Sequence, residues 1–134
     1  MSELVSALKR ASRGEVLRDV PLAPRTSVRV GGFAHFWVRP RDPEALVAVL
    51  GILCDAGVPW FTLGGGANTI VGDVGIEGAV LKLGPDFAAE QVEEGGDHAV
   101  LTLGAGAPIA FSCLIARASA VLHFATPVTY TVMV

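Results

Sequence analysis

The sequence predicts one domain of mixed helices and strands, organised on a strand–helix–strand unit. A strong helix start at residues 42–44 stands between two runs of aromatic and β-branched residues, which are typical of strands. Sixteen glycines and eight prolines among 134 residues favour many turns between short elements over a helical bundle. A hydrophobic content of 51% excludes a disordered chain, and the length fits a single core.

The first twenty residues are expected to form a leader that contains one short helix. Apolar residues recur at helical spacing over Leu4–Ala11 behind Ser2, a good capping residue, and Gly14 should end the helix. Two prolines within residues 19–24 predict an extended path. Residues 26–30 then alternate polar and apolar side chains, which predicts a strand that ends at a glycine pair.

The central unit runs from a strand through a helix to a second strand. Phe36–Val38 predicts the first strand, and Trp60–Leu63 predicts the second, which is expected to be buried. Asp42 is a capping residue followed by proline, so a helix should run from there to Ala56. Its nearly all-apolar surface predicts burial against a sheet. This order of elements predicts parallel pairing of the two strands through a right-handed crossover.

Further short strands are expected at residues 70–71, 79–83 and 99–103. Residues 84–97 are acidic and polar, and we expect them to form an exposed excursion. The Gly-Ala-Gly segment at residues 104–106 should open a helix over 109–120. Such a turn can bind an anion, but a simple strand-to-helix connection is the favoured interpretation here.

Charge is distributed unevenly along the chain. Residues 1–41 hold eight Lys and Arg against three acids, whereas residues 42–134 hold two against ten. The basic third can face the phosphates of a ligand, although a solvated surface is the favoured interpretation. No nucleic-acid partner is expected.

The cysteines and the uncharged segments predict a cytoplasmic protein without membrane contact. Cys54 and Cys113 lie in apolar helical patterns, where a thiol packs as a small hydrophobe, and this usage favours a reducing compartment. Residues 1–13 are amphipathic and charged, unlike a cleavable signal peptide. The uncharged stretch at residues 118–134 is too short to span a bilayer.

Three consecutive glycines, Gly64, Gly65 and Gly66, follow the predicted strand Trp60–Leu63 at once. Glycines let backbone N–H groups converge without side chains between them, and converging N–H groups bind anionic oxygen, usually of phosphate or diphosphate. The same run also fits a tight turn between two strands. Its spacing matches neither the Walker pattern nor the dinucleotide-binding glycine pattern, so the glycines alone leave both interpretations open.

Three stretches in order resemble one enzyme family. They are Ala23-Pro24-Arg25-Thr26-Ser27-Val28-Arg29-Val30-Gly31-Gly32, then Leu63-Gly64-Gly65-Gly66-Ala67-Asn68 with Asp73 and Gly75 beyond it, and Gly104-Ala105-Gly106. Together they are similar to the N-terminal FAD-binding domain of the UDP-N-acetylenolpyruvoylglucosamine reductases, also called UDP-N-acetylmuramate dehydrogenases, which make a bacterial cell-wall precursor. The resemblance covers about residues 21–115.

The resemblance implies an α+β fold, an FAD-binding domain of the vanillyl-alcohol-oxidase or PCMH type. Residues 1–20 would be the helix and leader, and residues 21–134 would be the FAD-binding domain. Within it, residues 21–84 would form a βαβ first lobe with the pyrophosphate loop. Residues 85–134 would form an incomplete second lobe.

The resemblance also implies which residues hold the cofactor, since the matching loop of the family wraps the FAD pyrophosphate. The implied cofactor-binding residues are Gly64, Gly65, Gly66, Ala67, Asn68 and Thr69. Asn68 would turn its amide to phosphate or hold the loop by an Asx-type bond. Ala67 stands where the family has serine, which removes one hydroxyl contact, worth about 1 kcal/mol.

No catalytic or metal-binding residue is assigned. Where the family has a glycine-rich stretch, residues 127–134 keep the register but lack every glycine, and the family's later segments with the catalytic side chains are not in the sequence. His35, His98 and His123 are scattered, and none lies near a carboxylate or cysteine at triad or ligand spacing.

The function implied by the resemblance is the reduction of UDP-N-acetylglucosamine enolpyruvate to UDP-N-acetylmuramate, with FAD as cofactor and NADPH as reductant. This chain would supply the FAD-binding part and would be inactive alone. The alternative is a noncatalytic nucleotide-binding or interaction module that self-associates through its apolar tail, residues 121–134. Another oxidoreductase of the same flavin superfamily is a third option.

Overall fold

The structure is a computed structural model that describes residues 2–95 and 98–107. The described residues fall into two compact units, which meet in sequence at Gly84 and Pro85. The first unit contains two α-helices and a four-stranded sheet, and the second contains a two-stranded hairpin. The fold is therefore mixed α and β, compatible with the predicted α+β class.

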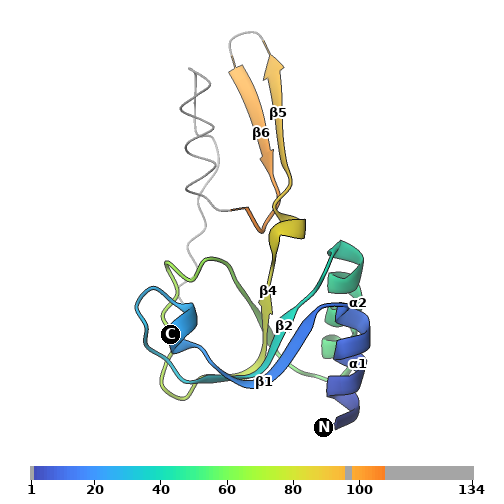
Figure 1. The fold of residues 1–134 in the computed structure, drawn as a ribbon, viewed down its shortest axis with the longest axis vertical. Coiled ribbons are helices and arrows are strands. Elements are labelled where there is room, and N and C mark those ends of the chain that lie inside the picture. Colours follow the sequence, from blue (N-terminus) through green and yellow to red (C-terminus); the bar gives the residue numbers. More distant parts are fainter. Residues whose placement is uncertain (1, 96–97, 108–134) are drawn as a thin grey trace. The chain divides into compact units, whose positions relative to one another are not determined.

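The sheet of the first unit has the strand order β1-β2-β4-β3, and its strands β1, β2 and β4 are labelled in Figure 1. Its strands are β1 (Glu15–Pro21), β2 (Phe33–Arg39), β3 (Trp60–Leu63) and β4 (Ile76–Lys82). The β1 and β2 strands are antiparallel, whereas β4 runs parallel to both β2 and β3. The carboxyl ends of three strands consequently meet at one edge.

The predicted pairing of β2 with β3 is wrong, because β4 lies between them. Four consecutive residues of β4, Gly78–Leu81, are buried. A strand that is apolar on both faces takes the centre of a parallel sheet. Because β3 is therefore an edge strand, it is less buried than expected. Leu63 is buried, but Trp60 is 45% exposed.

Helices α1 (Ser2–Ser12) and α2 (Pro43–Asp55) pack on one another and on one face of the sheet (Figure 1). The core between them is built from Leu8, Val16, Phe36, Val38, Val49, Leu53, Ala79 and Leu81. Both helices were predicted. The expected burial of α2 against a sheet is confirmed, although the sheet and α1 cover only one stripe of the helix, with Ala45, Val49 and Leu53 buried.

Exposed apolar residues on the outer side of α2 show this directly. Val47 is 70% exposed, and Cys54 is exposed as well, so its thiol is not packed as a small hydrophobe. Cys113 lies outside the described residues.

A second apolar cluster covers the face opposite the helices, and consists of Val20, Leu22, Ala34, Trp37, Leu63, Val71 and Val80. The register of β2 against β4 shifts between Ala34 and Phe36. The shift lets Phe36 point to the helices while Ala34 and Trp37 point to the opposite face. Both faces of the sheet therefore carry buried apolar residues.

Two predicted strands are loops, and one strand was not predicted. Residues 26–30 form a turn, because Arg29 has a φ of 57° and its N–H donates to the carbonyl of Thr26. Residues 70–71 are loop as well. By contrast, residues 15–21 of the expected leader are strand β1. Its charged residues mask the signal, since on this edge strand only Val16 and Val20 are buried.

The second unit contains a 3-10 turn at Pro85–Phe87 and the antiparallel strands β5 (Glu90–Gly95) and β6 (His98–Leu103). The strand at 99–103 was predicted. Within the expected exposed excursion at 84–97, residues 90–95 form a strand that pairs with β6 along its length. The predicted helix at 109–120 and the tail at 121–134 lie outside the described residues.

Among the described residues, neither helix is long and apolar enough to cross a membrane.

Two substitutions in α2 test the one-sided burial of this helix. Val49→Ala, at a fully buried position, should lower the free energy of unfolding by about 2 kcal/mol, because two methyl groups leave a packed core. Val47→Ala, at a mostly exposed position of the same helix, should change it by less than about 0.5 kcal/mol. Denaturant unfolding followed by circular dichroism measures both values, and equal losses would contradict the packing.

The cap of α2 predicts a pH dependence. Asp42 accepts a hydrogen bond from the Ala45 N–H at 2.9 Å and pairs with Arg13, and these contacts lower the pKa of its carboxyl below 3.8. Because the pKa of Asp42 is lower in the folded state, its carboxylate stabilises the fold at a pH above its ordinary pKa. This stabilisation is lost as the pH falls through the lowered pKa. Asp42→Ala should therefore destabilise at pH 7 and much less near pH 2.

The control for this prediction is Asp42→Asn, which caps a helix without carrying a charge. It should retain most of the stability at pH 7 and remove the pH dependence that comes from this position. Thermal unfolding of the three proteins across the pH range provides the comparison. An unchanged pH profile in Asp42→Ala would refute the role of the cap.

Candidate functional site

The glycine loop, residues 64–69, begins where β3 ends, at the edge where the parallel strands have their carboxyl ends. The pairing of Leu63 with Lys82 places the start of the loop beside the last residue of β4. Arg39, the last residue of β2, follows the pair formed by Val38 and Leu81 at the same edge. Ligands of parallel sheets bind at this end of the strands.

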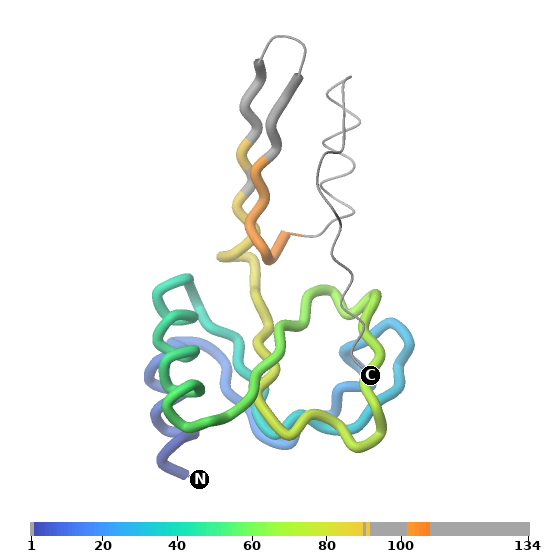
Figure 2. The backbone as a smooth tube through the Cα atoms, turned by 180° about the vertical axis from the view of Figure 1, so that it is seen from behind, coloured from blue at the N-terminus to red at the C-terminus, as the bar shows by residue number. Residues whose placement is uncertain are grey.

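Two carbonyl groups of the glycine loop accept hydrogen bonds from neighbouring segments of the chain. Lys82 Nζ donates to the carbonyl of Gly64, and the Ser27 N–H donates to the carbonyl of Gly66 at 2.9 Å. Gly66 has a φ of 73°, and a Cβ there would lie 2.3 Å from the carbonyl oxygen of Arg25. The loop therefore packs on the segment between β1 and β2, and the two run side by side in the chain trace (Figure 2).

The N–H groups of the glycine loop are not used by the rest of the described chain. Residues 64–69 donate no backbone hydrogen bond to any described residue. A Cβ on Gly64 or Gly65 would meet no atom of a described residue within 4 Å, so the space beside these two glycines is open within the described part of the chain. Open space and unused donors are what an anion-binding loop requires, whereas a tight turn would close on its own hydrogen bonds.

The other predicted site residues are exposed or half-buried. Ala67 and Asn68 are exposed, and the side chain of Asn68 makes no hydrogen bond with a described residue. The predicted Asx-type bond within the loop is therefore not formed. Thr69 is half-buried and lines a small cavity with Leu63 and Val71.

The second glycine segment, residues 104–106, differs in its hydrogen bonds. Gly104 donates to the carbonyl of Ala89 at 2.7 Å, and Gly106 donates to that of Phe87 at 2.9 Å. Its N–H groups are turned to the chain and already bonded. This segment is a structural connection, and the possibility that it binds an anion through those two N–H groups is wrong.

Three cations lie near the glycine loop on the face opposite the helices, and sequence reasoning did not assign them to the site. They are Arg25, Arg39 and Lys82. Burial, followed by the charges of Arg39 and Arg25, lowers the pKa of the Lys82 ammonium. The Arg25 guanidinium lies 3.9 Å from the centre of the Trp37 ring.

None of the three cations forms an ion pair with a described acid, since the described pairs involve only Arg13 and Arg18. Cations that repel one another without a counter-charge favour an anionic ligand. The signal in the sequence was the basic first third, which contains two of the three residues. The distribution of charge did not identify which of its cations share a surface with Lys82.

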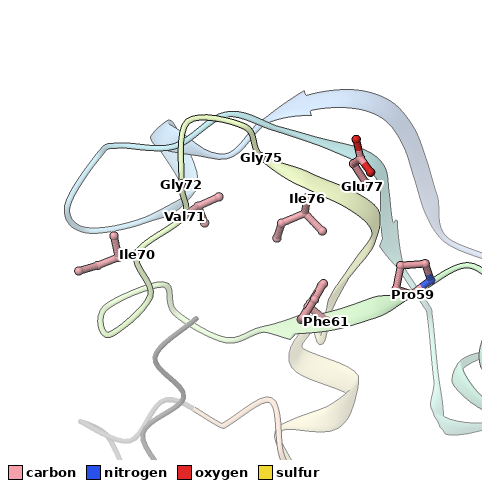
Figure 3. Close-up of a pocket in the computed structure, with 8 residues that line it drawn as sticks. All are labelled: Pro59, Phe61, Ile70, Val71, Gly72, Gly75, Ile76 and Glu77. Carbon is pink, nitrogen blue, oxygen red and sulfur yellow. The ribbon is translucent and has the colours of Figure 1, made fainter. Parts of the chain in front are cut away.

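An apolar cavity of about 300 Å³ lies between β3, β4 and the loop that precedes β4 (Figure 3). Its walls are Pro59, Phe61, Ile70, Val71, Gly72, Gly75, Ile76 and Glu77. Phe61, Val71 and Ile76 also line the small cavity that reaches Thr69. Apolar surface for a ring system thus adjoins the loop with unused N–H groups.

Within residues 2–95 and 98–107, no group of three or more His, Cys, Asp or Glu side chains is placed to hold a metal ion. His35 contacts the ring of Phe36, with centroids 6.0 Å apart, and lies away from the glycine loop. His123 lies outside the described residues. The described residues therefore provide a binding surface to which no acid–base pair is assigned.

The chain is similar to curated proteins named UDP-N-acetylenolpyruvoylglucosamine reductase. It is 55% identical over 103 residues to the protein of Anaeromyxobacter dehalogenans (strain 2CP-C), and the matched region covers 77% of this chain and 30% of that relative. It is 51% identical over 108 residues to that of Myxococcus xanthus, and the matched region covers 81% of this chain and 35% of that relative. The protein of Geobacter sulfurreducens is 43% identical over 101 residues, covering 75% and 33%.

The chain thus spans about a third of the length of the curated relatives it matches. No protein-family model matches it. The similarity to the relatives confirms the resemblance inferred from the three motifs.

Alanine substitutions in the glycine loop test its geometry. Gly66→Ala should cost about 1–3 kcal/mol of unfolding free energy, because its positive φ and the contact with Arg25 leave no room for a Cβ. Gly65→Ala, which faces open space, should change it by less than about 0.5 kcal/mol. Denaturant unfolding measures both, and tolerance of alanine at Gly66 would show that the loop is not packed on residues 25–26.

Proposed function

The chain is homologous to the UDP-N-acetylenolpyruvoylglucosamine reductases over about three quarters of its length, and on this premise we propose that it supplies the FAD-binding part of such an enzyme. The proposed domain is of the vanillyl-alcohol-oxidase or PCMH type and comprises residues 21–134, with residues 21–84 as its first lobe. The observation that carries the proposal is the set of unused N–H groups in the glycine loop.

The residues of the loop fit the diphosphate of FAD. Gly64, Gly65 and Gly66 would let the diphosphate approach the backbone, and the N–H groups up to Thr69 would donate to its oxygens. Three cations on the same face, Arg25, Arg39 and Lys82, would favour its negative charge. The adjoining apolar cavity offers surface to an aromatic ring of the cofactor.

The proposed reaction of the complete enzyme is the NADPH-dependent reduction of UDP-N-acetylglucosamine enolpyruvate to UDP-N-acetylmuramate, a step of peptidoglycan precursor synthesis in the cytoplasm. When bound, the flavin would supply hydride-transfer chemistry. The residues of this chain would bind and orient it. No acid or base is assigned here, so we propose that the chain alone does not turn over the UDP-sugar.

Titration with FAD tests the proposal. The chain should bind FAD and change its absorbance and fluorescence. Gly65→Ala should weaken binding at least about tenfold, since a methyl group would stand between the diphosphate and the loop, and should leave the unfolding free energy unchanged. The control is Gly51→Ala on α2, where a Cβ also meets open space; it should leave the affinity for FAD unchanged.

Two results would contradict the proposal. One is a chain that takes up no FAD; the other is an affinity that is equal in the original chain and in Gly65→Ala. Binding of other nucleotides without FAD, or self-association without any ligand, would favour the noncatalytic module instead. Size-exclusion chromatography with and without FAD separates these cases.

A further inference from the structure

We propose that Lys82 is a positioning residue that sets the direction of the N–H groups in the glycine loop by holding the carbonyl of Gly64. The proposal rests on the proposed function, because the oriented N–H groups would bind the diphosphate of the cofactor. It goes beyond that function by assigning a role to a residue of β4, outside the glycine loop. The motivating contact is the hydrogen bond from Lys82 Nζ to the Gly64 carbonyl.

The planarity of the peptide bond couples the direction of the Gly64 carbonyl to that of the Gly65 N–H. In a trans peptide the C=O of one residue and the N–H of the next lie in one plane and point in opposite directions. The described part of the chain has no cis peptide bond. Since Lys82 draws the carbonyl of Gly64 towards itself, the N–H of Gly65 must point away from Lys82, into the open space beside the two glycines.

A second peptide of the loop follows the same arrangement. The carbonyl of Gly66 accepts from the N–H of Ser27, so the N–H of Ala67 points away from Ser27. The two contacts fix alternate peptides of the loop through their carbonyl oxygens and leave the N–H ends without a described partner. Donors held in place before the ligand arrives spare the cost of ordering them on binding.

Glycine makes such a contact necessary. A peptide between two glycines can rotate with little steric resistance, because neither side has a Cβ. Gly66 is fixed by its close approach to Arg25, but no atom of the described residues lies near the position of a Cβ on Gly64 or Gly65. The ammonium of Lys82 is thus the described contact that prevents the Gly64–Gly65 peptide from turning its carbonyl into the anion site.

The position of Lys82 suits this role. It is the last residue of β4 and pairs with Leu63, so its backbone is held by the sheet next to the start of the loop. Its side chain is partly buried, and Arg39 and Arg25 repel its charge. An anion bound on the loop would lessen this repulsion, in addition to accepting from the oriented N–H groups.

Substitution of Lys82 tests the proposal against the effect of charge alone. Lys82→Met removes the donor and the charge, whereas Lys82→Arg retains both. Arg39→Met removes a charge from the same edge of the sheet without removing a described contact to the loop. Affinities for FAD and for inorganic pyrophosphate are measured by calorimetry at about 0.05 M and about 0.5 M salt.

We expect Lys82→Met to weaken both ligands about tenfold at low salt and to retain most of that loss at high salt, because a lost orientation is not screened. Arg39→Met should weaken them only a few fold, with the difference disappearing at high salt. Lys82→Arg should restore the affinity to within about threefold. Thermal unfolding verifies that the variants are folded. If Lys82→Met is misfolded, the comparison of the affinities of Lys82→Arg and Lys82→Gln tests the proposal instead.

The outcomes separate the inference from the proposed function. If FAD binds and the Lys82 variants lose no more affinity than Arg39→Met at both salt concentrations, the positioning role is refuted and the cofactor assignment stands. If FAD does not bind but pyrophosphate binds with the expected dependence on Lys82, the cofactor assignment fails and the positioning role stands. If neither ligand binds the original chain, both are refuted.

Discussion

The central place of β4 is the constraint on which the candidate site depends. Because β4 pairs in parallel with both β2 and β3, the last residues of three strands reach one edge of the sheet. Two of those residues are Arg39 and Lys82, and the third strand continues into the glycine loop. The pairing of β4 with β3 places Lys82 beside the start of the loop, and its pairing with β2 brings Arg39 to the same edge.

The two glycine segments show that composition alone does not make an anion site. Residues 104–106 use their glycine N–H groups to bond the chain at Phe87 and Ala89. Residues 64–69 instead bond the chain through carbonyl oxygens, and their N–H groups remain unused among the described residues. The distinction lies in which end of the peptide faces the protein, since only exposed N–H groups attract an anion.

The first unit has a well-defined hydrophobic core despite its small size. The helices cover one face, and the opposite face keeps a smaller apolar cluster around Trp37 and Val80. The shift of register in β2 supplies residues to both clusters from one strand. The face without helices carries the glycine loop and the cations, which agrees with its proposed use for a ligand.

The sequence by itself determined the local features: α1, α2 and the strands β2 and β3, because helical spacing, the Asp42 cap and β-branched runs act over neighbouring residues. It also determined the glycine motif and the likeness to the reductases. Only the tertiary structure decided that β4 separates β2 from β3, that residues 15–21 are a strand, and that residues 26–30 are a turn. These depend on partners distant in sequence, as does the contact of Lys82 with Gly64, and a local pattern holds no information about which distant groups will meet.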